Sequence, residues 1–252
     1  MTGNWQNWGD KRYADILYRR ALGELPEMES SKAVARRIKA IWKNGDTILD
    51  VGCGIGHYLV SLRRELGARF DYCGVDHLQY RIELARKAFD NDPYARFELA
   101  DLYKLPYVDS SFDIVTCNNL LQNLPALREP LCELLRVARK ALVLRLLCGE
   151  RTYLIREVHP HDPELDASGA PLEYNFYNIY SQHYVSQLLK EIGGIAEHRI
   201  EPDTDFSIEN LKALENGYDT SIGTRMIGNL QFNGYIMLPW SFLIVKKIRS
   251  AT

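Results

Sequence analysis

The chain lacks a strong charge of either sign. Its 252 residues carry 31 Lys and Arg against 33 Asp and Glu, which gives a formal net charge of −2. Proteins that bind nucleic acid through its phosphates usually carry an excess of basic residues, so this balance argues against a nucleic-acid partner. No apolar run approaches the roughly 18 residues that a membrane span needs, and we expect no membrane partner.

The chain also lacks any C-x-x-C pair, and its five cysteines make an odd count. Both features argue against a zinc site and against a disulfide framework. The two histidines of His159–Asp162 flank a proline, which is typical of a turn, so we predict no metal. The polar start Met1–Trp5 shows no apolar core of a secretory signal. Reduced thiols fit the inside of a cell, and we expect a cytoplasmic protein.

What the sequence does contain is a run of alternate glycines, Gly52, Gly54 and Gly56. They directly follow the apolar segment Thr47–Val51, and an amphipathic segment comes next. This order predicts a strand, a tight glycine loop and a helix, where a ligand can lie against backbone that has no Cβ atoms. A dinucleotide fingerprint, G-x-G-x-x-G, would need its last glycine at the position of His57.

Strand and helix patterns alternate from residue 46 onward. The strands that we predict are 47–51, 70–75, 96–99, 113–117, 141–147, 195–200 and 235–245. Such alternation predicts an α/β fold with a doubly wound, mainly parallel seven-stranded sheet and helices on both faces. Ligands bind these sheets at the carboxyl ends of the strands. A segment rich in Gly and Asn, residues 203–234, is predicted as an insertion before the last strand.

Residues 1–45 are predicted as a separate helical segment. Apolar residues recur there at the spacing of one helix face, up to Trp42. Residues 46–252 then form the sheet domain, with the glycine loop in a first half, 46–147, and a second half over 148–252.

Acidic residues follow the next two predicted strands. Asp76 ends the second strand 24 residues after Gly52, where a carboxylate can accept both ribose hydroxyls of a nucleotide. Asp101 follows the third strand. The fourth strand is preceded by the Leu-Pro-Tyr-Val-Asp-Ser-Ser-Phe-Asp-Ile-Val stretch, Leu105–Val115, and followed by Asn118–Leu124.

In order and spacing, these motifs resemble those of the Rossmann-like (class I) S-adenosylmethionine-dependent methyltransferases over residues 46–147. The G-x-G-x-G loop after Asp50 is similar to the first motif of that family, and Leu105–Val115 to the stretch before its fourth strand. The resemblance implies S-adenosylmethionine as the cofactor and methyl transfer as the activity. The chain departs from the family at Gln122 and Asn123, where many relatives carry histidines.

The resemblance also implies roles for matching residues. The glycine loop and the backbone near Asn118 would meet the methionine part of the cofactor. Asp76 would hold the ribose, His77 would flank the adenine and Asp101 would bond the adenine amine. The N-terminal helices, with Tyr13, would cover the cleft as a lid. The predicted cofactor-binding residues are Tyr13, Asp50, Gly52, Gly54, Gly56, Asp76, His77, Asp101, Leu102 and Asn118.

The predicted reaction is in-line transfer of a methyl group to an O or N atom of a small-molecule acceptor, such as a sugar or a secondary metabolite. An oxygen acceptor needs its proton removed, and histidine suits that task near neutral pH. His57 and His159 are therefore the candidate catalytic residues, although the sequence favours an ordinary surface or hydrogen-bonded histidine at each position. Aromatic and amide side chains over 174–180, with the insertion 203–234, are expected to build the acceptor side.

Two other interpretations stay open. The chain can be a non-catalytic, methyltransferase-like partner subunit that keeps the fold. It can also be a nicotinamide-dependent oxidoreductase, although the missing glycine at position 57 counts against that. Binding measured with both cofactors would separate these cases.

Overall fold

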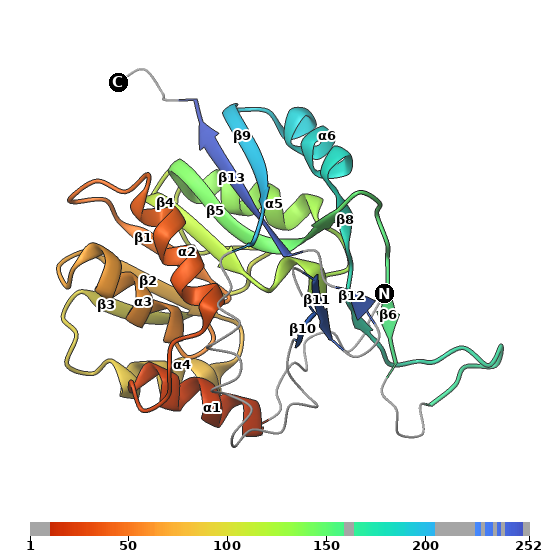
Figure 1. Ribbon diagram of the computed structural model, residues 1–252, viewed down its shortest axis with the longest axis horizontal. Helices are drawn as coiled ribbons and strands as arrows, with labels where there is room; N and C mark the ends of the chain where they lie inside the picture. Colours follow the sequence, from red (N-terminus) through yellow and green to blue (C-terminus); the bar gives the residue numbers. More distant parts are fainter. Residues whose placement is uncertain are drawn as a thin grey trace.

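A computed structural model describes residues 11–158, 164–204, 225–227, 230–233, 236–237 and 240–248. Its centre is one sheet with the strand order β3-β2-β1-β4-β5-β13-β9 (Figure 1). These strands are β1 (Ile48–Val51), β2 (Tyr72–Asp76), β3 (Ala95–Leu99), β4 (Phe112–Asn118), β5 (Ala138–Gly149), β9 (Ile195–Pro202) and β13 (Trp240–Lys247). β13 lies antiparallel between β5 and β9, and the pairs among β1 to β5 are parallel. The predicted mainly parallel seven-stranded sheet is confirmed.

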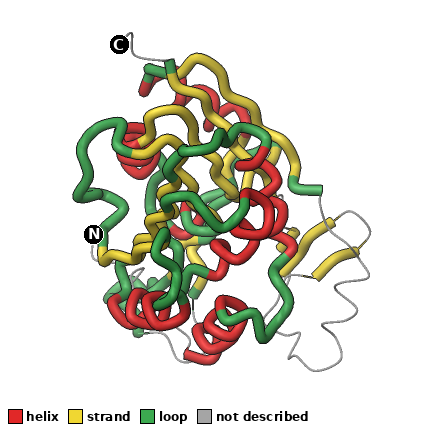
Figure 2. Tube along the Cα trace, turned by 90° about the vertical axis from the view of Figure 1, so that its left-hand side faces the viewer, coloured by secondary structure: helices red, strands yellow, loops and turns green. Residues whose placement is uncertain are grey.

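Helices cover both faces of this sheet, as the turned view in Figure 2 shows. The helices are α1 (Lys11–Ala21), α2 (Glu29–Lys39), α3 (His57–Leu66), α4 (Gln79–Ala88), α5 (Arg128–Val137) and α6 (Gln182–Ile192). Buried side chains of α1 to α4 share one core cluster, and those of α5 and α6 share the other. The chain therefore forms three layers, helix–sheet–helix, as the alternation predicted.

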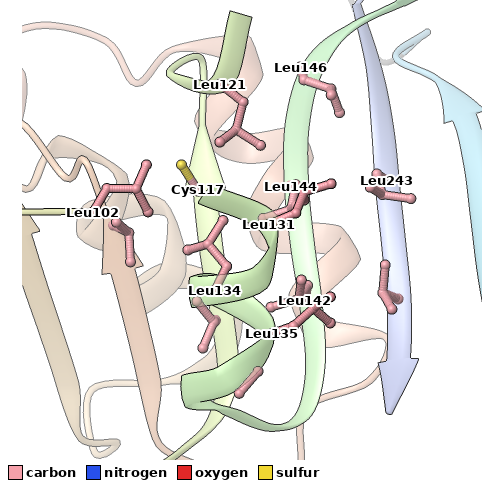
Figure 3. Close-up of a cluster of buried hydrophobic side chains, with 14 of the residues drawn as sticks. Leu102, Cys117, Leu121, Leu131, Leu134, Leu135, Leu142, Leu144, Leu146 and Leu243 are labelled. Carbon is pink, nitrogen blue, oxygen red and sulfur yellow. The ribbon is translucent and has the colours of Figure 1, made fainter. Parts of the chain in front are cut away.

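The α5 face shows how the sequence pattern builds this core. Alternate side chains of β5 point to one face, because a strand has a period of two. The α5 side chains that meet them are spaced by three and four residues, which places them on one side of a helix. The residues that meet are Leu142, Leu144 and Leu146 from β5 and Leu131, Leu134 and Leu135 from α5 (Figure 3).

Several predicted boundaries differ from the structure. The chain passes from α5 into β5 at Ala138 without an intervening turn, so β5 begins before the predicted residue 141. The predicted strand 235–245 divides into a short β12 (Ile236–Met237) and β13, which begins at Trp240. The predicted start was wrong, and Pro239, between β12 and β13 in the sequence, is the signal that it overlooked, because proline is disfavoured inside a strand.

Short strands complete the fold. β8 (Tyr180–Ser181) pairs with the end of β5, and β6 (Arg156–Glu157) pairs with β7 (Asn175–Phe176). A separate antiparallel sheet contains β10 (Arg225–Ile227), β11 (Leu230–Asn233) and β12. It falls mostly within the predicted insertion, and the rest of that insertion lies largely outside the described residues.

The N-terminal helices pack on the same sheet face as α3 and α4. Ala14 and Leu17 of α1, and Val34 and Ile38 of α2, are all buried in one core cluster with those helices. Figure 1 places α1 at the end of the molecule where α4 also lies. The division of the chain at residue 45, and the closing of a cleft by these helices, remain predictions.

Candidate functional site

The glycine loop joins β1 to α3 and is held by backbone conformations that favour glycine. Gly52, Gly54 and Gly56 have φ values of 75°, 58° and 76°, in the left-handed region. A Cβ atom on Gly52 would lie 2.6 Å from Leu120 Cδ2, and one on Gly56 would lie 2.6 Å from Phe97 Cε1. A Cβ atom on Gly54 would meet nothing closer than 3.9 Å. Gly54 is thus the member of the triplet that is least crowded, with Leu17 of α1 and His57 as its nearest neighbours.

Asp76 ends β2 beside this loop and is buried. Its Oδ2 accepts a hydrogen bond from the Gly54 backbone N–H at 3.0 Å, and its Oδ1 accepts one from the Leu78 N–H at 3.0 Å. His77 Nδ1 and an Arg81 nitrogen lie 3.6 and 3.7 Å from the same carboxylate. Each carboxylate oxygen can accept two hydrogen bonds, so Asp76 keeps capacity for a pair of ligand hydroxyls.

Asp50 lies beneath the loop, at 2% exposure. Burial raises the pKa of Asp50 to about 7, against the opposing effect of a 2.8 Å hydrogen bond from the Tyr72 hydroxyl and with a smaller contribution from the charge of Asp76. Its carboxyl therefore links β1 to Tyr72 of β2. A cofactor contact of Asp50 stays a prediction.

The end of β4 faces the loop and presents unpaired acceptors. Asn118 donates through Nδ2 to Thr116 Oγ1 at 2.8 Å, but its buried Oδ1 has no hydrogen-bond partner within the described part of the chain. The same holds for Gln122 Oε1 and Asn123 Oδ1 in the next turn. Buried acceptors without partners cost free energy, so this cluster suits a ligand that carries N–H or O–H donors. The ammonium and hydroxyl groups of S-adenosylmethionine are donors of this kind.

His57 begins α3 and lies beside Gly54, since its Cε1 is 4.0 Å from the position of a Cβ on that glycine. Burial, with smaller contributions from the charges of Arg20 and Arg81, lowers the pKa of His57 to about 3. Its Nδ1 is buried and has no hydrogen-bond partner among residues that the structure describes. The ring is therefore neutral at physiological pH, and its low pKa makes it a weak base, so it suits hydrogen bonding to a ligand better than proton abstraction.

The remaining predicted residues occupy varied environments. Asp101 accepts a hydrogen bond from the Tyr103 N–H at 2.9 Å in an exposed turn after β3, and Leu102 is buried in the α5-side core (Figure 3). Tyr13 lies on α1 with 44% of its surface exposed. His159 lies outside the described residues. The roles of all four stay predictions.

The aromatic stretch after β6 is only partly available to an acceptor. Tyr180 is 2% exposed and Asn178 is fully buried, so both belong to the core. Asn178 accepts a hydrogen bond from the Ile155 N–H and donates to the Leu124 carbonyl, at 3.0 and 2.9 Å. Tyr177 is half-buried. Burial raises its pKa to about 12, with smaller contributions that include the charge of Glu157, so its phenol stays protonated.

Sequence reasoning missed a buried polar group at this end of the sheet. Arg145 of β5 is 3% exposed and pairs with Asp203, just after β9, and with Asn119, just after β4. One signal was present, because Arg145 interrupts the apolar run of Leu142–Leu147. A charge in the middle of a buried strand needs a partner, which sequence alone does not name.

Residues 42–173, more than half of the chain, match the family model described as a methyltransferase domain. The chain belongs to this family. The match confirms the predicted class, the S-adenosylmethionine-dependent methyltransferase domain, and with it the class of cofactor. In the described residues, no helix is long and apolar enough to cross a membrane.

Curated relatives are similar over part of their length. The chain is 36% identical over 150 residues to a demethylmenaquinone methyltransferase of Deinococcus radiodurans, covering 59% of this chain and 55% of the relative. It is 29% identical over 168 residues to a 2-phytyl-1,4-naphtoquinone methyltransferase of Nostoc punctiforme, covering 65% and 66%. An uncharacterized 37.1 kDa protein of a Streptomyces fradiae transposon is 26% identical over 190 residues, covering 75% and 51%. The chain spans about half the length of the first curated relatives it matches.

Solved structures show the same fold. A phosphoethanolamine N-methyltransferase 2 of Haemonchus contortus aligns with a TM-score of 0.59 at 16% identity, covering 87% of this chain and 52% of that one. A methyltransferase of Methanosarcina mazei aligns with a TM-score of 0.53 at 18% identity, covering 85% and 98%. A [4+2]-cyclase, SpnF, aligns with a TM-score of 0.56 at 16% identity, covering 88% and 81%.

Proposed function

We propose that this protein transfers the methyl group of S-adenosylmethionine to an O or N atom of a small-molecule acceptor. One observation carries the proposal. The uncrowded backbone of Gly54, the carboxylate of Asp76 and the unpaired buried oxygen of Asn118 lie at the carboxyl ends of β1, β2 and β4, which are neighbours in the sheet. Ligands of open α/β sheets bind at this edge.

In this proposal, each group has one task. Bound S-adenosylmethionine supplies a methyl group on a positively charged sulfur. Asp76 accepts the ribose hydroxyls, the bare backbone at Gly54 admits the amino-acid half, and Asn118 Oδ1 accepts a hydrogen bond from its ammonium group. Neutral His57 donates or accepts a hydrogen bond at the loop side. Most of the rate increase in a displacement of this kind comes from alignment, which can supply about 7–11 kcal/mol.

The names of the relatives suggest which class of acceptor this protein methylates. Relatives named as methyltransferases of quinones are 29 to 36% identical to this chain over their matched regions. We therefore place reduced quinones first among candidate acceptors, with sugars and secondary metabolites next. A reduced quinone offers a phenolic oxygen, within the proposed O or N transfer, and a ring carbon, which would extend it. Tyr177, whose phenol is protonated, and Tyr13 of α1 are the proposed aromatic walls.

Two measurements test the proposal. Calorimetry should show binding of S-adenosylmethionine and of its demethylated product, S-adenosylhomocysteine, and no binding of NAD. A screen with an isotopically labelled methyl donor should then transfer label to one acceptor class. Absence of binding at millimolar cofactor would contradict the proposal. Tight binding with no transfer to any acceptor would favour the non-catalytic alternative.

A further inference from the structure

A continuous series of buried and part-buried hydrogen bonds crosses the sheet at its carboxyl end. Arg145 Nε donates to Asp203 Oδ2 at 2.7 Å, and an Arg145 terminal nitrogen donates to Asn119 Oδ1 at 2.6 Å. Asn119 Nδ2 donates to the Tyr58 hydroxyl at 3.1 Å, and that hydroxyl donates to Ser30 Oγ at 2.9 Å. The series therefore links β9, β5, the turn after β4, α3 and α2.

Arg145 is costly to place where it lies. Its side chain is 4% exposed, and a buried charge is tolerated only when it is paired and hydrogen-bonded. Asp203 neutralises the guanidinium, which also lies 4.1 Å from the centre of the Trp240 ring. A lysine could satisfy one partner as a point charge. The planar fork of arginine can hold Asp203 and Asn119 in fixed directions at once.

Asn119 is the residue that this fork fixes. Its φ of 58° is in the left-handed region, where asparagine is one of the few side chains tolerated. Arg145 holds it twice, since the Asn119 backbone N–H also donates to the Arg145 carbonyl at 2.9 Å. The Asn119 carbonyl in turn accepts from Asn123 Nδ2 at 3.1 Å. Both the backbone and the side chain of Asn119 are thus fully engaged.

The residues directly before and after Asn119 in the sequence both border the proposed cofactor site. Asn118 carries the unpaired buried Oδ1, and Leu120 lies against Gly52, where its Cδ2 would be 2.6 Å from an added Cβ. Tyr58, the other partner of Asn119, directly follows His57 at the start of α3. A shift of Asn119 would therefore move groups on both sides of the site.

We propose that Arg145 is a positioning residue for the cofactor site: by fixing Asn119, it holds the turn 118–120 and the start of α3 in the arrangement that receives S-adenosylmethionine. The inference rests on the proposed function, because it assigns Arg145 to that site. Arg145 acts through Asn119 and does not itself contact the cofactor. Its effect is on affinity, beyond its contribution to folding.

Calorimetric titration with S-adenosylhomocysteine tests this on four variants, each with its melting temperature measured. Arg145→Lys keeps the charge that faces Asp203 but loses the fork, and Asn119→Gly keeps a residue that adopts a φ of 58° without strain. Both should weaken binding by about tenfold, the scale of losing a charge-assisted hydrogen bond. The double variant should be no weaker than the worse single one, because the two residues act as one unit.

The matched control is Arg139→Met, at the opposite end of β5. Arg139 Nε donates to Asp113 Oδ1 at 2.9 Å, so this variant also loses an arginine–aspartate pair of the same strand. It should lower the melting temperature and leave the affinity within about twofold of the wild type. This separates positioning from stability.

The possible failures are distinguishable. Wild-type protein that does not bind S-adenosylhomocysteine overturns the proposed function and this inference with it. Wild-type binding with folded Arg145→Lys and Asn119→Gly proteins within about twofold of it overturns only the role of Arg145. Fold-losses that multiply in the double variant also overturn it, since independent sites add in free energy.

Discussion

The carboxylate of Asp76 accepts a hydrogen bond from the backbone N–H of Gly54 across 3.0 Å. The residue proposed to hold the ribose thus also fixes the loop proposed to admit the methionine part. Substitution of Asp76 would therefore remove the proposed ribose contact and the support of the loop together.

Asp76→Ala should weaken the binding of S-adenosylmethionine by about 1–3 kcal/mol, the scale of losing hydrogen bonds to a charged group. Isothermal titration calorimetry measures the change. Asp90→Asn, an exposed carboxylate change next to Asn91, is the control and should bind as the wild type does. Unchanged affinity in folded Asp76→Ala protein would refute the ribose assignment.

Gly54→Val should abolish cofactor binding while the protein stays folded. A Cβ there would lie 3.9 Å from Leu17 and 4.0 Å from His57, so the Val methyl groups would press on these side chains, and the φ of 58° adds about 1–2 kcal/mol for an L-residue. Gly67→Ala is the control for backbone strain, because Gly67 has φ 91° and ψ 172°, a region nearly confined to glycine, and it ends α3 away from the loop. Thermal melts show whether both variants are folded, and binding titrations show whether each still binds the cofactor. Normal binding by folded Gly54→Val protein would show that the loop does not receive the cofactor.

His57 should make the protein sensitive to acid. Its folded pKa, lowered to about 3 by burial, lies below the unfolded value of 6.5, so the unfolded chain takes up the proton first. The stability that this histidine contributes is present above pH 6.5 and is lost as the pH falls toward 3. Urea unfolding of wild type and His57→Gln at pH 7.5 and pH 5 should show the wild type losing more. An equal loss of unfolding free energy in the wild type and in His57→Gln would show that the imidazole is accessible to protons in the folded state.

Asp113 should also tie stability to pH, at the opposite end of the sheet. Burial by itself would raise the pKa of Asp113, but hydrogen bonds from Arg139, Thr47 and Lys140 outweigh it and hold that pKa well below its usual range. The stabilisation is therefore complete above the unfolded value of 3.8 and fades as the pH falls through the lower folded value. Asp113→Asn should cost about 1–3 kcal/mol at pH 7.

The measurement for Asp113 is urea unfolding of both proteins across pH 2 to 7. The gap between wild type and Asp113→Asn should close in the acid range. A gap that stays constant down to pH 2 would contradict the ion-pair account, because the pKa of Asp113 would then be the same in the folded and unfolded chains.

Local patterns made much of the fold predictable. The alternation of strands and helices, with glycines directly after β1, led to the correct sheet class and to the loop whose three φ values are positive. Element ends were less predictable. The direct passage from α5 into β5 at Ala138 leaves no glycine or proline as a marker.

The candidate site was predictable in part. The glycine loop and Asp76 followed from spacing, since both come directly after a strand. The state of His57 did not, because its low pKa depends on burial and on Arg20 and Arg81 from two other helices. Gln122 and Asn123 looked like simple departures from a family pattern, and the structure places their oxygens, buried and unpaired among described residues, in the turn after β4.

The sequence by itself determined which segments become strands and helices and where backbone without side chains would be exposed, because periodicity and glycine spacing act within a single element. Only the tertiary structure decided what Arg145 does. Its partners lie 26 and 58 residues away in the chain, at Asn119 and Asp203. They meet because β5 lies next to β4 and is separated from β9 only by β13, and that order of strands is set by the packing of the whole sheet.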